Sequence, residues 1–309
     1  MAVGGYYSHY LDKEMRLYEG YYFERFTQRF MDSVNRNSVY LEGVKLFGEN
    51  LELRARVVEH VYNKLQHKHK EEPVCSPLNT RYLKGVFNYF LTGQYYFLPE
   101  ASLTLIYKFY DVIDTVPPFG NPIYSYANQI GAVALNVKTH DTEAIFNFYK
   151  KGWSLYVDFV YGRYNDGNIK QVRSVNLGYR ICDLPETEVS YGYFYLDFLN
   201  PPPEFCQNGI IQPVYYAPKN FEVHQLNFST YYDYTDCLQI GMEADIVYLP
   251  QVNNTGNSAF FYLLYTPLEN LSLRLDLRYY HQNDVVTRML VFKGGYQAKN
   301  AVLTVGYVF

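Results

Sequence analysis

Residues 270–280 read NLSLRLDLRYY and set the period of the chain. On an extended strand the four leucines of this stretch fall on one face, and the serine, the aspartate and both arginines fall on the other, because successive side chains alternate. In a helix the same residues would spread arginine and leucine around the whole circumference. The period is therefore two, which indicates a β-strand.

The same alternation recurs through most of the chain, for example in 238–248 and in 300–309. We count about sixteen strands, including 130–138 and 286–296, while 143–150 is either a further strand or part of a turn. No helical segment alternates with them, which excludes a βαβ architecture. An open sheet of this width would expose long hydrophobic edges, and closure removes them. The sequence predicts an all-β, antiparallel up-and-down β-barrel.

Length and composition narrow the alternatives further. The chain has 309 residues without a Pro/Gly/Ser-rich linker or a charge block, so we expect one barrel domain over residues 1–309. Residues 1–37 are the least regular, and an N-terminal helix or plug is an open alternative there. The net charge of -4 and the pI of about 6.0 give no field that would attract nucleic acid.

The chain lacks any run of eighteen apolar residues, which excludes membrane-spanning helices but not membrane-spanning strands of about ten residues. The first residues also lack the pattern of a signal peptide, so we expect a mature chain or an excised domain.

His67 and His69 lie in a charged stretch, 63–80, that we interpret as a solvated loop. The four cysteines have no CxxC spacing. We therefore expect no metal site and no cofactor.

Two arrangements could accommodate this pattern: a soluble sheet that buries its apolar face, or a membrane barrel that turns this face toward lipid. The apolar faces of the clearest strands are nearly free of charge. The chain contains 36 tyrosines and a single tryptophan, and the tyrosines gather near strand ends, as an interfacial girdle requires. These features favour the membrane barrel.

Two short segments resemble known families. The last strand ends with Tyr307 and Phe309 on one face, which resembles the C-terminal signal of bacterial outer-membrane barrels that the barrel-assembly machinery reads. Residues 215–221, YYAPKNF, resemble the tyrosine-serine-proline motif that leads into a strand in the C-terminal barrels of tetratricopeptide-containing exopolysaccharide export porins. Here Ala217 stands where serine is usual. These resemblances imply a bacterial outer-membrane location and export of a polysaccharide.

The residues on the opposite face of the strands would line the lumen. The predicted path of the substrate consists of Arg54, Arg56, Lys84, Tyr156, Asp158, Arg180, Asp233, Glu243, Asp245, Arg274, Asp276 and Arg278. Both signs of charge are present, so strong selection for one charge is not indicated. Such a surface suits sugar hydroxyls, and in the alternative interpretation the same residues only solvate the pore and pair with one another.

The predicted function is a channel that exports an exopolysaccharide, with a general or substrate-selective diffusion porin and a surface receptor or adhesin as alternatives. The expected partners are outer-membrane lipid and lipopolysaccharide, the barrel-assembly machinery, a periplasmic export scaffold and the polysaccharide, and not nucleic acid. An enzyme is disfavoured because His224 and Ser229, the best local pair, fall on opposite faces of one strand.

The lengths of the connections predict an unusual sidedness. Counted back from the C-terminus over the expected strands, the longer connections (63–80, 114–124, 200–218 and 250–257) fall on the side of the chain ends. Ordinary bacterial barrels place short turns on that side.

Overall fold

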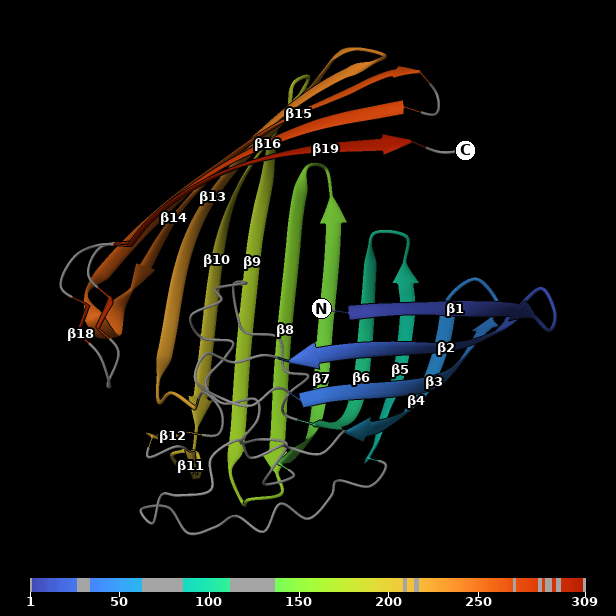
Figure 1. Ribbon diagram of the computed structural model, residues 1–309. Coiled ribbons are helices and arrows are strands. Elements are labelled where there is room, and N and C mark those ends of the chain that lie inside the picture. The colour runs from blue at the N-terminus through green and yellow to red at the C-terminus, as the bar shows by residue number, and fades with distance from the viewer. Residues whose placement is uncertain are drawn as a thin grey trace. The chain divides into compact units, whose positions relative to one another are not determined.

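The computed structural model describes residues 2–26, 34–62, 86–111, 137–207, 210–213, 217–268, 271–282, 285–286, 291–292 and 296–307. Fifteen strands of this part of the chain form one antiparallel up-and-down sheet (Figure 1). Among the same residues, no helix is both long and apolar enough to cross a membrane. The fold is therefore all-β, as the sequence predicts, with fifteen strands in the sheet instead of about sixteen.

The sheet follows the order of the chain. Its strands are β1 (Ala2–Tyr10), β2 (Met15–Phe26), β3 (Val34–Phe47), β4 (Leu51–Tyr62), β5 (Val86–Leu98), β6 (Ala101–Asp111), β7 (Lys138–Lys150), β8 (Trp153–Tyr164), β9 (Ile169–Asp183), β10 (Glu186–Phe198), β13 (Phe221–Thr235), β14 (Leu238–Leu249), β15 (Asn254–Leu268), β16 (Leu271–Gln282) and β19 (Tyr296–Tyr307). Two short hairpins, β11 (Glu204–Gln207) with β12 (Ile210–Pro213) and β17 (Val285–Val286) with β18 (Val291–Phe292), lie outside this sheet, and η3 (Pro250–Val252) is a single 3-10 turn.

The chain divides into two compact units. Unit 1 comprises Met1–Ile145, Phe159–Gln171 and Asp197–Lys219, and unit 2 comprises Phe146–Asp158, Val172–Leu196 and Asn220–Phe309. The division cuts through β7, β8, β9 and β10.

Local sequence explains the tight turns. Lys151 and Gly152 join β7 to β8 with φ angles of 52° and 83°, a left-handed pair that matches the twist of a hairpin. Gly167, at φ 86°, lies within the sequence NDGN, where the sequence predicts the turn between β8 and β9. These turns place consecutive strands side by side and fix their register.

The structure decides two alternatives that the sequence leaves open. The open alternative of a helix within residues 1–37 is wrong for 2–26 and 34–37, which form β1, β2 and the start of β3. Their tyrosines and phenylalanines favour strands, and β2 is paired with β3 along its whole length and with β1 from Arg16 to Glu24. Residues 143–150 belong to a strand, β7, whereas most of the expected strand 130–138 lies outside the described residues.

One prediction about the strands is wrong: the described residues of 286–296 do not form a continuous strand of the sheet. The described parts of this segment form the two-residue strands of the β17–β18 hairpin and the first residue of β19, and β16 pairs directly with β19. When this strand is removed from the count, the longer connections no longer fall on the side of the C-terminus. The connections of two residues follow β5, β7, β9, β13 and β15, whereas the four-residue connections 165–168 and 250–253 follow β8 and β14. The end of β19 lies on the side of the turn after β15, because β19 runs in the direction of β15. The two-residue turn nearest to the C-terminus therefore shares its side.

The two faces of the sheet differ in an unusual way. Many large apolar side chains are exposed, among them Val39, Leu41, Leu53, Val57, Leu91, Leu105, Leu177, Ile181, Leu226, Ile246, Leu303 and Val305. Charged and polar side chains are buried, among them Arg36, Ser38, His60, Asn88, Asp141, Glu143 and Lys170. A soluble protein would have the opposite distribution.

Candidate functional site

The pairing register assigns side chains to faces, because directly opposed residues lie on one face of a sheet. In unit 2, Leu275 of β16 is opposite Leu263 of β15 and Leu303 of β19. The neighbouring Asp276 is opposite Tyr262. We call the side of Leu275 the apolar face and the side of Asp276 the polar face, and the polar face is the candidate site.

Asp245 organises the polar face of unit 2. Its Oδ1 accepts hydrogen bonds from Gln225 Nε2 and Asn227 Nδ2, both at 2.7 Å, and its Oδ2 accepts one from Ser258 Oγ at 2.8 Å. These donors come from β13 and β15, on either side of β14. The carboxylate, which is half-buried, thus connects three strands through polar groups that carry no positive charge.

The other predicted residues of unit 2 mostly form short-range pairs. Arg274 Nε donates to Asp276 Oδ1 at 2.8 Å, and Arg180 lies 2.7 Å from the carboxylate of Glu186. Asp233 accepts a hydrogen bond from Gln239 Nε2 at 2.8 Å. Three more residues, on β8, β14 and β16, keep exposed or half-buried side chains: Asp158, Glu243 and Arg278. Tyr156 of β8 is 36% exposed.

In unit 1 the predicted arginines lie on β4. Arg54 contacts Glu52 at 3.1 Å and Glu42 at 3.5 Å, and Arg56 lies 3.9 Å from Glu42. Glu42 is directly opposite Arg56 on β3, so all four side chains share one face. The predicted lumen residues of both units are therefore largely paired with neighbouring groups.

Unit 1 also contains a buried cluster that sequence reasoning did not identify. Asp141 of β7, only 2% exposed, accepts hydrogen bonds from Tyr110 OH at 2.6 Å, Thr139 Oγ1 at 2.6 Å and Lys170 Nζ at 2.5 Å. Lys108 and Glu143 form a further pair beside it. In this cluster a buried carboxylate is paired with an ammonium and has its other contacts satisfied.

A second buried group in unit 1 joins a serine to a histidine. Asn88 Nδ2 lies 2.8 Å from His60 Nε2, and Ser38 Oγ lies 2.7 Å from His60 Nδ1. All three side chains are at most 1% exposed. We interpret this group as structural.

The pair considered for an enzyme does not meet. His224 is opposite Tyr248 and Ser229 is opposite Glu243, five residues apart on the regular part of β13 and hence on different faces. His224 Nδ1 contacts Tyr191 OH at 2.6 Å on the apolar face. The prediction that the two residues lie apart is confirmed.

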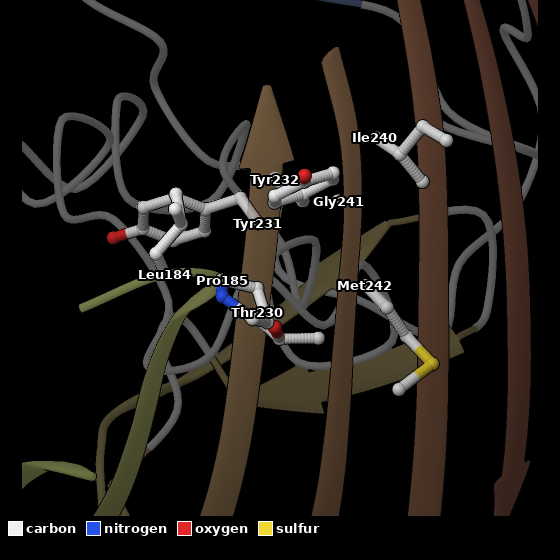
Figure 2. Close-up of a pocket in the computed structure, with 8 residues that line it drawn as sticks. All are labelled: Leu184, Pro185, Thr230, Tyr231, Tyr232, Ile240, Gly241 and Met242. Carbon is white, nitrogen blue, oxygen red and sulfur yellow. The ribbon is translucent and has the colours of Figure 1, made fainter. Parts of the chain in front are cut away.

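A shallow hollow of about 440 Å³ lies in unit 2 at the turn between β9 and β10. Figure 2 shows Leu184 and Pro185, from the turn between β9 and β10, beside β13, and the side chains of Ile240 and Met242 on β14. Two of its hydroxyl groups are engaged: that of Thr230 contacts Thr187 at 3.0 Å, and that of Tyr231 donates to Glu186 at 3.2 Å. The lining is mainly apolar and offers no catalytic arrangement.

The segment that resembles the exopolysaccharide export porins is described from Ala217 onward. Asn220, at φ 49°, precedes β13; its side-chain oxygen accepts a hydrogen bond from Tyr195 OH at 3.0 Å, and its carbonyl accepts one from Gln251 at 2.6 Å. The segment thus secures the start of the strand that follows the longest described connection. Lys84 and Phe309 lie outside the described residues, and Tyr307 is the last residue of β19.

Alternation places the members of both buried groups on the polar face, but it does not show which of them meet. His60 continues the face of Arg54 and Arg56 on β4, and Asp141 shares a face with Glu143 on β7. The partners of Asp141 are 29 to 31 residues away in the sequence, apart from Thr139. Which charged residues meet therefore depends on the register, which the sequence does not specify for strands joined by long connections.

No protein family matches this chain by sequence, and no characterised protein does. Solved structures do resemble it. A bacterial polysaccharide outer membrane secretin matches with a TM-score of 0.60 and 12% identity over 97% of this chain and 87% of that one. The outer membrane channel DcaP of Acinetobacter baumannii matches with a TM-score of 0.46 and 10% identity, over 88% of this chain and 84% of that one. OccAB2 of the same organism matches with a TM-score of 0.41 and 13% identity, over 95% of this chain and 91% of that one. The first of these carries the inference: the chain has the fold of bacterial outer-membrane β-barrels.

Proposed function

We propose that this chain is a channel of the bacterial outer membrane through which a polysaccharide leaves the cell. The observation that carries the proposal is the exposure of large apolar side chains on one face of the sheet and the concentration of charged and polar side chains on the other. Hydrocarbon is the solvent that suits the first surface, and water in a lumen suits the second. In this proposal residues 1–309 form a single barrel.

Two observations favour a polysaccharide as the cargo. The structure that resembles this chain at the highest of the quoted TM-scores is a polysaccharide secretin. The polar faces carry amides, tyrosines and paired charges, which hydrogen-bond to hydroxyl groups without requiring a charged partner. The predicted path of the substrate, from Arg54 to Arg278, is part of this proposal.

The experiment is reconstitution of the purified chain into planar lipid bilayers and into liposomes. We expect discrete conductance steps, and we expect dextran-loaded liposomes to release their polymer only when they contain the protein. Folded protein that produces no conductance would contradict the channel. Passage of small sugars without polymer would instead support the diffusion porin, and conductance only after removal of a segment would support a plugged receptor.

A further inference from the structure

A three-layered arrangement of glycine, tyrosine and a partly exposed arginine occurs in each unit, on three consecutive strands; in unit 1 Gly4, Tyr22 and Arg36 repeat it at a longer distance, 6.0 Å, with a buried arginine. In unit 1, Gly20 of β2 is opposite Tyr40 of β3, and the guanidinium of Arg56 from β4 lies 4.4 Å from the centre of the Tyr40 ring. In unit 2, Gly241 of β14 is opposite Tyr262 of β15, and the guanidinium of Arg274 from β16 lies 4.8 Å from the centre of that ring. We call each arrangement with a partly exposed arginine a Gly–Tyr–Arg stack.

The two stacks have the same register as well as the same composition. Tyr40 is opposite Val58, and Arg56 precedes Val58 by two residues. Tyr262 is opposite Asp276, and Arg274 precedes Asp276 by two residues. The arginine therefore crosses the tyrosine diagonally in the same direction in both units.

The glycine allows the tyrosine to lie flat. A Cβ atom at position 20 would lie 2.7 Å from Tyr40 Oη, and one at position 241 would lie 2.8 Å from Tyr262 Cδ1, closer than real Cβ atoms approach. The ring therefore rests on the backbone of the neighbouring strand. The Tyr262 hydroxyl also donates to Gln239 Oε1 at 3.1 Å, which holds that ring in place.

The charge of each arginine is balanced by a deeper carboxylate. The side chain of Arg274 is 42% exposed whereas that of its partner Asp276 is 13% exposed. The side chain of Arg56 is 36% exposed and that of Glu42, 3.9 Å away, is 14% exposed. Each stack thus presents a flat guanidinium with N–H donors while its net charge is close to zero.

We propose that the two Gly–Tyr–Arg stacks are binding platforms for the sugar units of an uncharged polysaccharide, an inference that rests on the proposed function. A flat guanidinium supported by a ring fits the flat face of a pyranose, and its N–H groups donate to ring and hydroxyl oxygens. A polyanion gains little, because the deeper carboxylate cancels the attraction of the arginine. The class of cargo is therefore a neutral, hydroxyl-rich chain.

The test measures how sugar hexamers interrupt the ion current of the reconstituted protein. The probes are cellohexaose, which is neutral, and a hexamer of galacturonate, which has the same length and carries a charge on every unit. We expect cellohexaose to block at a concentration roughly tenfold lower, which is ~1.4 kcal/mol. A hexagalacturonate that blocks as well as cellohexaose, or better, would overturn the proposal.

Substitutions in the stacks test whether these residues hold the cellohexaose that blocks the ion current. Tyr262→Ala and Tyr40→Ala should each shorten the residence of cellohexaose about fivefold, which is ~1 kcal/mol. Gly241→Ala should act in the same direction because its methyl group displaces the ring. Gly43→Ala is the matched control, since nothing lies within 4 Å of its Cβ position. Equal residence in Gly241→Ala and Gly43→Ala would contradict the stacks.

Asp276→Asn distinguishes the effect of the Asp276 charge from the effect of the contact between Arg274 and Tyr262. It leaves Arg274 over Tyr262 without its balancing carboxylate, so hexagalacturonate should become the better blocker. An unchanged preference would count against the proposed balance of charge. Heat-modifiable gel mobility confirms that each variant is folded.

A folded protein that forms no pore would contradict the proposed function and leave the stacks testable. In that case calorimetry of the detergent-solubilised protein with cellohexaose replaces the current measurement. Binding that disappears in the Tyr40→Ala, Tyr262→Ala double variant would support the platforms, and absence of binding in the parent protein would overturn them.

Discussion

Asp141 in unit 1 and Asp245 in unit 2 have the same number of side-chain donors but different surroundings. Asp141 is 2% exposed and one of its three donors is the ammonium of Lys170. Asp245 is half-buried and its donors are two amides and a hydroxyl. The polar face of unit 1 is thus partly closed by side chains that satisfy one another, whereas that of unit 2 keeps its polar groups within reach of water.

This difference assigns different tasks to similar residues. Burial makes a hydrogen bond to a charged group expensive to break, because the partners left behind have no water to replace it. The cluster around Asp141 therefore stabilises the strands that meet there. The polar groups around Asp245 contribute less stability and are the ones that a polymer could contact.

The largest effect should follow from removing the carboxylate of Asp141. Asp141→Ala leaves the ammonium of Lys170 and the hydroxyls of Tyr110 and Thr139 buried without their acceptor, and we expect a loss of about 3–5 kcal/mol in the free energy of unfolding. Urea unfolding in lipid vesicles measures it. Asp141→Asn keeps an acceptor oxygen but not the charge, so its free energy of unfolding should lie between those of the parent protein and Asp141→Ala. A loss below that of Asp245→Ala would contradict the comparison.

A charge on the apolar face should have the next largest effect. Leu275→Arg places a guanidinium on the side of Leu263 and Leu303, which costs about 2–4 kcal/mol near the middle of a bilayer. We expect a strong decrease in assembled protein, seen as loss of heat-modifiable mobility. Arg274→Leu, on the neighbouring position of the polar face, should leave folding intact. Equal behaviour of the two variants would mean that the faces are assigned incorrectly.

The corresponding change in unit 2 should be milder. In Asp245→Ala the amides of Gln225 and Asn227 and the hydroxyl of Ser258 can bond to water, so we expect a loss of only about 1 kcal/mol. The same urea titration measures it, and single-channel recordings of this variant show whether the pore is preserved. A loss as large as that of Asp141→Ala would show that this face is also dry.

The smallest effect belongs to exposed ion pairs at a tight turn. Lys45 Nζ lies 3.7 Å from Asp12 and 3.5 Å from Glu14, and both carboxylates are more than half exposed. Lys45→Ala should change the free energy of unfolding by ~0–1 kcal/mol, and the change should shrink as salt is added. A larger or salt-independent change would show that the turn contributes more than its exposure indicates.

The sequence predicts the parts of this structure that depend on alternation. The facing of Leu275 and Arg274, the turn at Gly167 and the separation of His224 from Ser229 all follow from a period of two. The count of strands depends on 286–296, where alternation continues without a place in the sheet, and this one strand reversed the predicted sidedness. Short apolar alternation does not distinguish a sheet strand from a hairpin in a connection.

The charged contacts follow less directly from the sequence. Arg56 was predicted to line the lumen, but the glycine at position 20 that lets Tyr40 lie flat beneath it is 36 residues away in the chain. The role of Gly20 can be recognised only when the strand register is known, because the register places Gly20 opposite Tyr40. The same holds for the Asp141 cluster, in which strands separated by long connections bring a tyrosine and a lysine to one carboxylate.

The most direct test uses Trp153, the single tryptophan of the chain, which needs no substitution. Its ring lies on the side opposite to Ser154, against the exposed ring of Tyr179 at 4.7 Å. In vesicles of phospholipid brominated near the glycerol end of the acyl chains, we predict strong quenching of its fluorescence and little quenching by aqueous iodide. Quenching by iodide without quenching by the brominated lipid would show that water, and not hydrocarbon, covers the apolar face.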